Sequence, residues 1–223
     1  MDPDLTKEFF AVIKSGETAK VDDLLRKHPD LVDARTKSGA SPILFALYTG
    51  HADLAEHIAS RGPALDVHEA ASLGKMDRLR KLVAADPQVV NAVSEEGFTP
   101  LGLAAYLGQA EAVKFLLSKG ADVNFVSPAT GFTALTGAVA SNHKIVVELL
   151  LAHGANVNHV YEDGLTPLSE AAANGNVEIV KLLLANGANV QAKHKDGKTA
   201  LAFALERGHH EVADLLRQRG GTA

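Results

Sequence analysis

The chain has 223 residues, of which 46% are hydrophobic and 22% charged, a balance typical of a soluble, folded protein. The formal net charge of −5 provides no basic field to attract a polyanion, which argues against a nucleic-acid partner. Cysteine is absent, which excludes disulfides, thiolate metal sites and a cysteine nucleophile. The sequence shows no secretory signal and no apolar run long enough to span a bilayer. We therefore expect a cytoplasmic monomer with no membrane partner.

A five-residue pattern, Gly-x-Thr followed by Pro or Ala and then Leu, recurs at steps of 33 or 34 residues. It begins at Gly97, Gly131, Gly164 and Gly197, and a weaker copy begins at Gly39. A second marker at similar spacing is a small residue expected to end the first helix of each repeat: Gly16, Gly50, Gly74, Gly108, Asn142, Gly175 and Gly208. Together they divide the chain into seven units, residues 1–36, 37–63, 64–94, 95–128, 129–161, 162–194 and 195–223.

The fourth unit shows how each repeat is expected to fold. Thr99 is a good N-cap and Pro100 suits the first helical position, so a helix begins there and ends at Gly108, which can adopt left-handed geometry. Apolar residues at i, i+3 and i+4 spacing predict a second helix, which ends at Gly120. The short, turn-rich stretch that follows predicts a hairpin-like loop before the next unit.

No single unit can bury its own apolar face, but stacked units can, which predicts an all-α solenoid of helix pairs. A Gly-Ala pair also recurs at Gly120, Gly154 and Gly187, 34 and 33 residues apart. In its repeat length and in the Thr-Pro-Leu and Gly-Ala signals, the sequence resembles the ankyrin repeat family over nearly its full length. That family usually carries histidine after Thr-Pro-Leu and uses it for hydrogen bonds between neighbouring turns. Here Gly102, Thr136, Ser169 and Ala202 stand at that position, and Thr136 and Ser169 could supply a weaker substitute.

One repeat step, between the second and third units, is about ten residues short. Gly62 runs almost directly into Asp66, which with Glu69 forms a capping-box-like helix start, so no room remains for a hairpin. Residues 16–62 also align with 74–120 at an offset of 58, with matching glycines and prolines. This favours a two-unit block present twice, with drift of one hairpin loop as the alternative. Either way, we expect a gap in the row of loop tips.

Both terminal units carry polar residues where the middle units are apolar. The first helix has Lys7 and Glu8, and Arg217 occupies a position that is leucine in the three preceding units. Because terminal units of a solenoid need a polar outer face, we expect the array to be complete.

The sequence offers no constellation of catalytic residues. The ten histidines do not form a metal-binding pattern, and the adjacent His209 and His210 would point to different helix faces. Phosphate-binding glycine loops and a nucleophile elbow are missing, and the carboxylates are spread over helix surfaces. In the turns Asp122-Val123-Asn124 and Asn156-Val157-Asn158, the asparagines are interpreted as residues that cap their own turns. We therefore predict a non-enzymatic protein without a cofactor, metal or catalytic residue.

Positions that the repeat does not explain point to binding. The residue after each turn glycine is Ala40, Phe98, Phe132, Leu165 or Lys198, and the ankyrin resemblance implies that this position projects from the loop tip into a concave groove. Tyr48 and Tyr106 lie on the exposed side of two first helices, and Phe125 and Tyr161 lie in adjoining turns. Because aromatic anchors are typical hot spots, we predict a partner-binding surface formed by Tyr48, Phe98, Tyr106, Phe132, Leu165 and Lys198. Packing of Phe98 and Phe132 against neighbouring loops is the alternative.

Charge gives a further indication of the partner. Residues 82–188 contain four basic and ten acidic residues, which favours a basic or neutral peptide over nucleic acid. The leading hypothesis is a protein-interaction scaffold that binds a protein or peptide through its concave groove and loop tips. The alternatives are a regulatory or inhibitory subunit of a separately encoded enzyme and a self-associating array.

Overall fold

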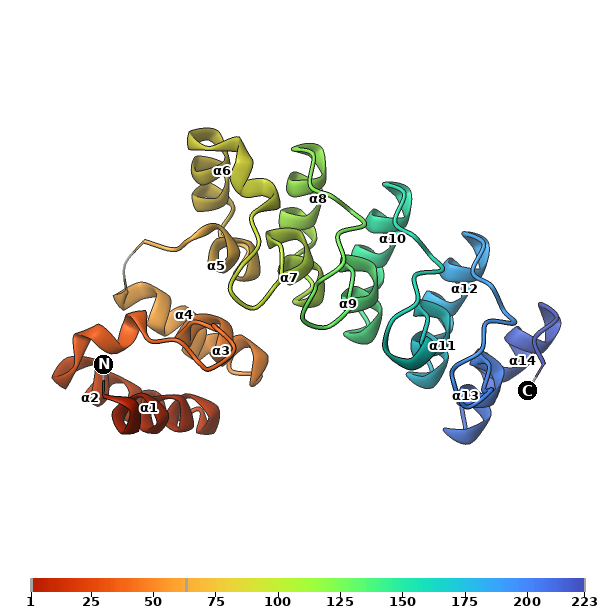
Figure 1. The fold of residues 1–223 in the computed structure, drawn as a ribbon, viewed down its shortest axis with the longest axis horizontal. Coiled ribbons are helices and arrows are strands. Elements are labelled where there is room, and N and C mark those ends of the chain that lie inside the picture. The colour runs from red at the N-terminus through yellow and green to blue at the C-terminus, as the bar shows by residue number, and fades with distance from the viewer. Residues whose placement is uncertain (1, 63, 223) are drawn as a thin grey trace.

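The computed structural model describes residues 2–62 and 64–222, which form consecutive antiparallel helix pairs stacked side by side (Figure 1). Within these residues there is no β-strand, and an isolated bridge joins Tyr161 to Leu165. The predicted all-α solenoid is therefore confirmed. The first helices of the pairs are α1 Pro3–Ser15, α3 Pro42–Tyr48, α5 Val67–Ser72, α7 Pro100–Tyr106, α9 Ala134–Ala140, α11 Pro167–Ala173 and α13 Ala200–Glu206.

The second helices form a row of their own, seen along the upper edge of Figure 1 from α6 to α12. They are α2 Thr18–Lys27, α4 Ala52–Arg61, α6 Met76–Ala85, α8 Ala110–Ser118, α10 Lys144–Ala152, α12 Val177–Ala185 and α14 His210–Gln218. Short 3-10 turns, η1 Pro29–Asp33, η2 Pro87–Asn91 and η3 Glu162–Gly164, lie in the connections. Among the described residues, no helix has both the length and the apolar character needed to cross a membrane.

The predicted start and stop signals act as expected. The Thr99 hydroxyl accepts a hydrogen bond from the Gly102 N–H at the start of α7, and Asp66 and Glu69 form the full capping box of α5. Asn142, which replaces a glycine in the marker series, has φ 60° and so adopts the same left-handed geometry.

Glycine at the end of a first helix has a second role, which the sequence interpretation missed. A Cβ added at Gly175 would lie 2.5 Å from the His209 ring, and that ring bonds to the Ala173 carbonyl 3.0 Å away. In the same way, the His51 ring lies against Gly16 and bonds to the Lys14 carbonyl, and the Gln109 side chain lies against Gly74 and bonds to the Ser72 carbonyl. These side chains begin the second helix of one unit and cap the first helix of the unit before it.

Asparagines join successive turns. The Asn124 side chain donates to the Gly154 carbonyl (3.1 Å) and accepts from the Asn156 N–H (2.8 Å), both in the following turn. Asn91, Asn158 and Gln191 also donate to a glycine carbonyl of the following turn. The prediction that asparagine caps its own turn is confirmed at Asn156, which accepts from the Asn158 N–H. It is wrong at Asn124 and Asn158, whose side chains bond to the following turn, and Asp122 caps the turn of Asn124 instead. Thr136 and Ser169 also do not bridge turns, since both bond within their own N-caps.

The hydrophobic core has two large clusters. One runs from α5 to α14, and the other fills α1 to α4 around Phe9, Ile13, Val21 and Ile58 and also includes Leu73, which follows α5. We call the chain up to residue 62 the N-terminal block and the chain from residue 64 the C-terminal block. In Figure 1 the N-terminal block lies below α5 rather than continuing the row of second helices.

The expected gap in the row of loop tips is not there. The short step does lack a hairpin, since α4 ends at Arg61 and α5 begins at Val67. The loop at 36–40 packs directly on the loop at 94–98, so closely that a Cβ added at Gly39 would lie 2.5 Å from the Cβ of Glu95. A third cluster, with Ala40, Leu44 and Leu103 buried, forms where these loops meet. The missing hairpin therefore brings the second and fourth units into contact.

Candidate functional site

Each loop tip is held by a short hydrogen-bonded turn. In the fourth unit the Ser94 N–H donates to the Phe98 carbonyl (2.9 Å), and the Gly97 N–H donates to the Ser94 carbonyl (2.9 Å). Gly97 has φ 82°, a conformation that glycine adopts without strain. Equivalent turns close on Ala40, Phe132, Leu165 and Lys198, so the loop geometry fixes the residue after the turn glycine in every case.

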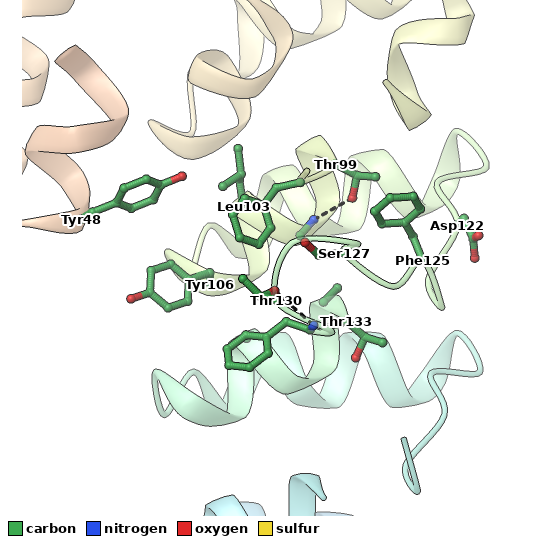
Figure 2. Close-up of a pocket in the computed structure, with 14 residues that line it drawn as sticks. Tyr48, Thr99, Leu103, Tyr106, Asp122, Phe125, Ser127, Thr130 and Thr133 are labelled. Carbon is green, nitrogen blue, oxygen red and sulfur yellow. Dashed lines mark hydrogen bonds between the residues drawn. The ribbon is translucent and has the colours of Figure 1, made fainter. Parts of the chain in front are cut away.

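A pocket of about 290 Å³ lies where the second, fourth and fifth units meet (Figure 2). We call it the junction pocket. It brings together four of the six predicted binding residues, Tyr48, Phe98, Tyr106 and Phe132. The other lining residues are Thr99, Gly102, Leu103, Asp122, Phe125, Ser127, Thr130, Thr133, Ala134 and Gly137.

Both the N-terminal and the C-terminal block contribute aromatic side chains to the junction pocket, and these side chains pack against one another or against neighbouring residues. Tyr48 comes from α3, and its ring lies 6.3 Å from the Tyr106 ring of α7, edge to face at 73°. Phe132 contacts Tyr161 in the same manner, with ring centroids 5.0 Å apart. Phe98 and Tyr48 also pack against the third hydrophobic cluster. Phe98 and Phe132 therefore both pack within the chain and line the pocket, while Tyr106 remains 40% exposed.

Glu96 does not line the pocket itself, but it is hydrogen-bonded to Tyr48, which does. Its carboxylate accepts from the Tyr48 hydroxyl (3.3 Å), and the residue is only 9% exposed. Burial raises the pKa of Glu96, while the Tyr48 hydrogen bond and the charge of Arg35 oppose that rise. Burial and the Glu96 carboxylate raise the pKa of Tyr48, so its hydroxyl stays a donor. Within the described residues, Glu96 has no lysine or arginine within ion-pair distance.

Ser127 is the second polar residue of interest at the pocket. Figure 2 places it between Thr99 and Thr133. Its hydroxyl is buried and finds no hydrogen-bond partner in the described part of the chain. Neither Glu96 nor Ser127 could be singled out from the sequence, because their burial depends on contacts between loops.

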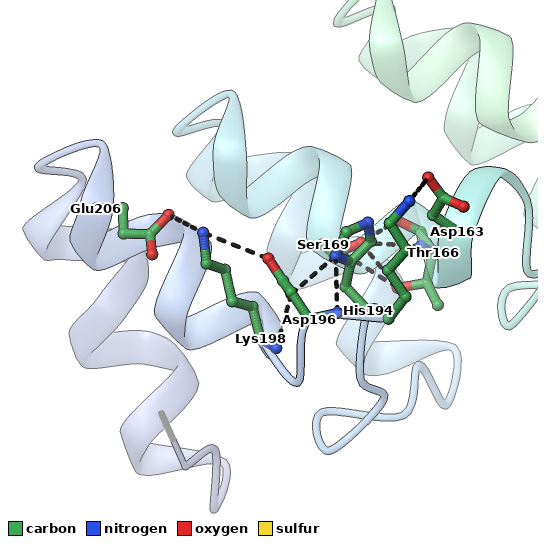
Figure 3. A network of polar contacts seen from close by, with 8 residues as sticks. Asp163, Thr166, Ser169, His194, Asp196, Lys198 and Glu206 are labelled. Carbon is green, nitrogen blue, oxygen red and sulfur yellow. Dashed lines mark hydrogen bonds and ion pairs between the residues drawn. The ribbon is translucent and has the colours of Figure 1, made fainter.

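Leu165 and Lys198 lie outside the junction pocket. Leu165 is half-buried beside Tyr161, to which it is bridged through the backbone. Lys198 pairs with Glu206 (2.9 Å) and Asp196 (3.4 Å), as Figure 3 shows. The His194 ring nitrogen bonds to Asp196 (2.8 Å), and this bond, followed by the one from the Lys198 N–H (3.1 Å), lowers the pKa of Asp196 to about 2. Lys198 is thus held by its own unit.

Charge is distributed unevenly around the stack. All four lysines of residues 82–188 lie on second helices or directly after one of them: Lys114, Lys119, Lys144 and Lys181. Within residues 82–188, the loops around the junction pocket carry Glu95, Glu96 and Asp122, and the segment of the N-terminal block that packs on them carries Arg35 and Lys37. The contribution of residues 82–188 to the pocket side is therefore acidic, which favours a cationic partner over an anionic one.

The lining of the junction pocket is suited to binding an apolar group. The pocket walls are mainly aromatic and aliphatic, and no nucleophile in them is paired with a base. Among the described residues, no group of three or more histidine, aspartate or glutamate side chains is arranged to hold a metal ion.

Comparison with protein families agrees with the architecture. The family model described as ankyrin repeats (3 copies) matches residues 67–161 and 146–222, which together cover more than half of the chain. The first 66 residues lie outside these matches, although helices α2 to α4 repeat the boundaries of α6 to α8 at an offset of 58 residues, apart from the longer α4. A search of curated proteins finds no match. The repeats, the helix pairs and the family match agree, and the chain belongs to the ankyrin repeat family.

Proposed function

We propose that this protein is a non-enzymatic scaffold that binds a basic or neutral protein segment through its concave side and loop tips. Ankyrin repeats are in general protein-interaction modules. The observation that carries the proposal is the junction pocket, where four of the predicted aromatic side chains, from three units, surround an apolar space. Large aromatic side chains in a partly enclosed apolar site are the usual anchors of protein interfaces.

Leu165 and Lys198 extend the proposed surface along the neighbouring loop tips. Lys198 contributes less than the aromatic residues, because a partner must compete with its ion pairs to Glu206 and Asp196. The proposed surface is therefore centred on Phe98, Tyr106 and Phe132.

The proposal is tested by selecting peptides from a random phage-displayed library on the purified protein. Binding of the selected peptides is then measured by calorimetry for Tyr106→Ser and for the matched control Ile145→Ser. Both residues are exposed, Tyr106 at 40% and Ile145 at 64%, but Ile145 lies on α10 outside the pocket. We expect Tyr106→Ser to weaken binding by about 1–3 kcal/mol and Ile145→Ser to leave it unchanged. Peptides that bind both variants like the unmodified protein would refute the proposal.

Phe98→Ala and Phe132→Ala should also weaken binding by about 1–3 kcal/mol each. Because Phe98 packs against the third hydrophobic cluster and Phe132 against Tyr161, both should also lower the denaturation midpoint. Binding is therefore measured where each variant is fully folded. Normal binding by the folded variants would assign both aromatics to loop packing alone.

A further inference from the structure

The junction pocket exists because the third unit lacks its hairpin. Its lining residues come from the second unit (Tyr48), the fourth and the fifth, with none from the third. In an uninterrupted stack, the loop of the third unit would separate Tyr48 from Phe98 and Tyr106. The pocket is therefore particular to this chain and is not a repeated feature of the array.

Glu96 gives the pocket a defined electrostatic preference. It is buried against Tyr48, it has a single side-chain hydrogen bond, and it forms no ion pair within the described residues. A buried carboxylate with few partners is stabilised by a cation brought near it. The faces of the Tyr48 and Tyr106 rings also attract cations. The lysines of residues 82–188 all lie on or beside second helices. The charge of Arg35 acts on Glu96, but Arg35 forms no ion pair with it, so a place for a closer cation remains.

The size and lining of the pocket indicate what kind of group carries the positive charge. A space of about 290 Å³ lined by Phe98, Leu103, Phe125 and Phe132 takes a group larger than a single ammonium ion. Lysine and arginine side chains combine an apolar stem with a cationic end, and a neighbouring apolar side chain can fill the remaining volume.

We propose that the junction pocket binds an organic cation with an apolar body, and that Glu96 supplies the preference for the positive charge. This inference rests on the proposed function: in the complex, the group that fills the pocket is a lysine or arginine side chain of the partner, next to a large apolar side chain. The apolar body lies among the rings, and the cationic end lies toward Tyr48 and Glu96. The exposed Asp122 at the pocket contributes little, because solvent screens its charge.

The test uses three probes of similar size and shape, namely 3-phenylpropylammonium, 3-phenylpropan-1-ol and 3-phenylpropionate. Each is titrated into the full chain and followed through the amide NMR shifts of Phe98, Gly102 and Ser127. We expect the ammonium to bind about fivefold more tightly than the alcohol, and the carboxylate to bind most weakly. An alcohol that binds as tightly as the ammonium, or shifts confined to residues outside the pocket, would overturn the inference.

Two variants identify the carboxylate responsible. Glu96→Gln keeps the shape and an acceptor for the Tyr48 hydroxyl, so it should bind the alcohol normally and lose the ammonium preference. Asp122→Asn is the matched control and should keep that preference. If Glu96→Gln keeps the preference, or Asp122→Asn loses it, the assignment to Glu96 is wrong.

The outcomes also separate this inference from the proposed function. Selected peptides that require Tyr106 but bind equally well after their basic residues are replaced would leave the scaffold function standing and refute the cation site. Probes that bind as expected, together with a selection that yields no Tyr106-dependent peptide, would support a cation site and refute the proposed peptide partner.

Discussion

Glu96 illustrates how a loop residue changes character when a distant unit covers it. It lies in a turn, where a carboxylate is ordinarily solvated, yet the second unit and the Tyr48 side chain leave it 9% exposed. Burial raises its pKa above the ordinary value of 4.5, so folding is favoured more when Glu96 is protonated than when it is ionised. The stability linked to Glu96 is therefore fully present below pH 4.5 and is lost as the pH rises through the folded-state pKa.

A comparison of unfolding at different pH values tests this statement. Relative to the unmodified protein, Glu96→Gln should unfold at a higher urea concentration at pH 7.5, because an amide is buried at lower cost than a carboxylate. The advantage should shrink as the pH falls through the raised folded-state pKa, because Glu96 then takes up its proton. A difference in midpoint that stays constant across this range would show that the charge of Glu96 is not what matters.

The asparagine series makes a second prediction at the residue scale. Asn124→Ala removes two hydrogen bonds to the following turn, to the Gly154 carbonyl and from the Asn156 N–H. We expect a loss of about 1–2 kcal/mol in unfolding free energy. Asn156→Ala serves as the control, because its side chain accepts one hydrogen bond within its own turn. If urea unfolding shows the same loss of unfolding free energy for both variants, the hydrogen bonds between units stabilise the protein no more than the one within a turn.

At the scale of elements, the ends of the first helices join one unit to the next. Gly175 ends α11 with φ 71°, and the His209 ring of the next unit lies where a side chain would be. Gly208 ends α13 with φ 74°, and no atom lies within 4 Å of the corresponding position. The two glycines thus share their backbone geometry and differ only in the contact with the following unit.

These two glycines form a matched pair for mutation. Gly208→Ala should cost about 1–2 kcal/mol, which is the strain of left-handed geometry alone. Gly175→Ala should cost about 1 kcal/mol more, because the His209 ring must also leave its hydrogen bond to the Ala173 carbonyl. Thermal or urea unfolding of both variants measures the difference. Equal destabilisation would show that the ring contact adds nothing.

At the scale of the whole molecule, the two large hydrophobic clusters predict two cooperative units. The N-terminal block has only two helix pairs around its own cluster, and five connecting residues, 62–66, link α4 to α5. In a solenoid, stability grows with the number of stacked neighbours, so this block should open before the centre of the C-terminal block.

Native-state hydrogen exchange at low denaturant concentrations measures this order. Amides of α1 to α4 should share one opening free energy, lower than that of α7 to α12. The α13–α14 pair should also open early, because it packs against one neighbouring pair. A single opening free energy from α1 to α14 would contradict the division into two blocks.

Much of this molecule follows from local sequence. Thr99, Pro100 and the left-handed residues at Gly108 and Asn142 act within one or two turns of chain, so their effect on helix starts and ends could be predicted from the sequence. The 33-residue period predicted stacked helix pairs for a related reason, since each pair needs the apolar face of the next.

Only the tertiary structure decided how the units meet where the repeat is interrupted. The sequence showed that a hairpin is missing but predicted a gap, whereas the loops of the second and fourth units close over it. That contact buries Glu96, turns Tyr48 toward Tyr106 and forms the junction pocket. Caps and turns depend on neighbouring residues, whereas burial depends on which distant surfaces pack together. In this protein that packing joins Tyr48 to Glu96, 48 positions further along the chain, and to Tyr106, 58 positions further along.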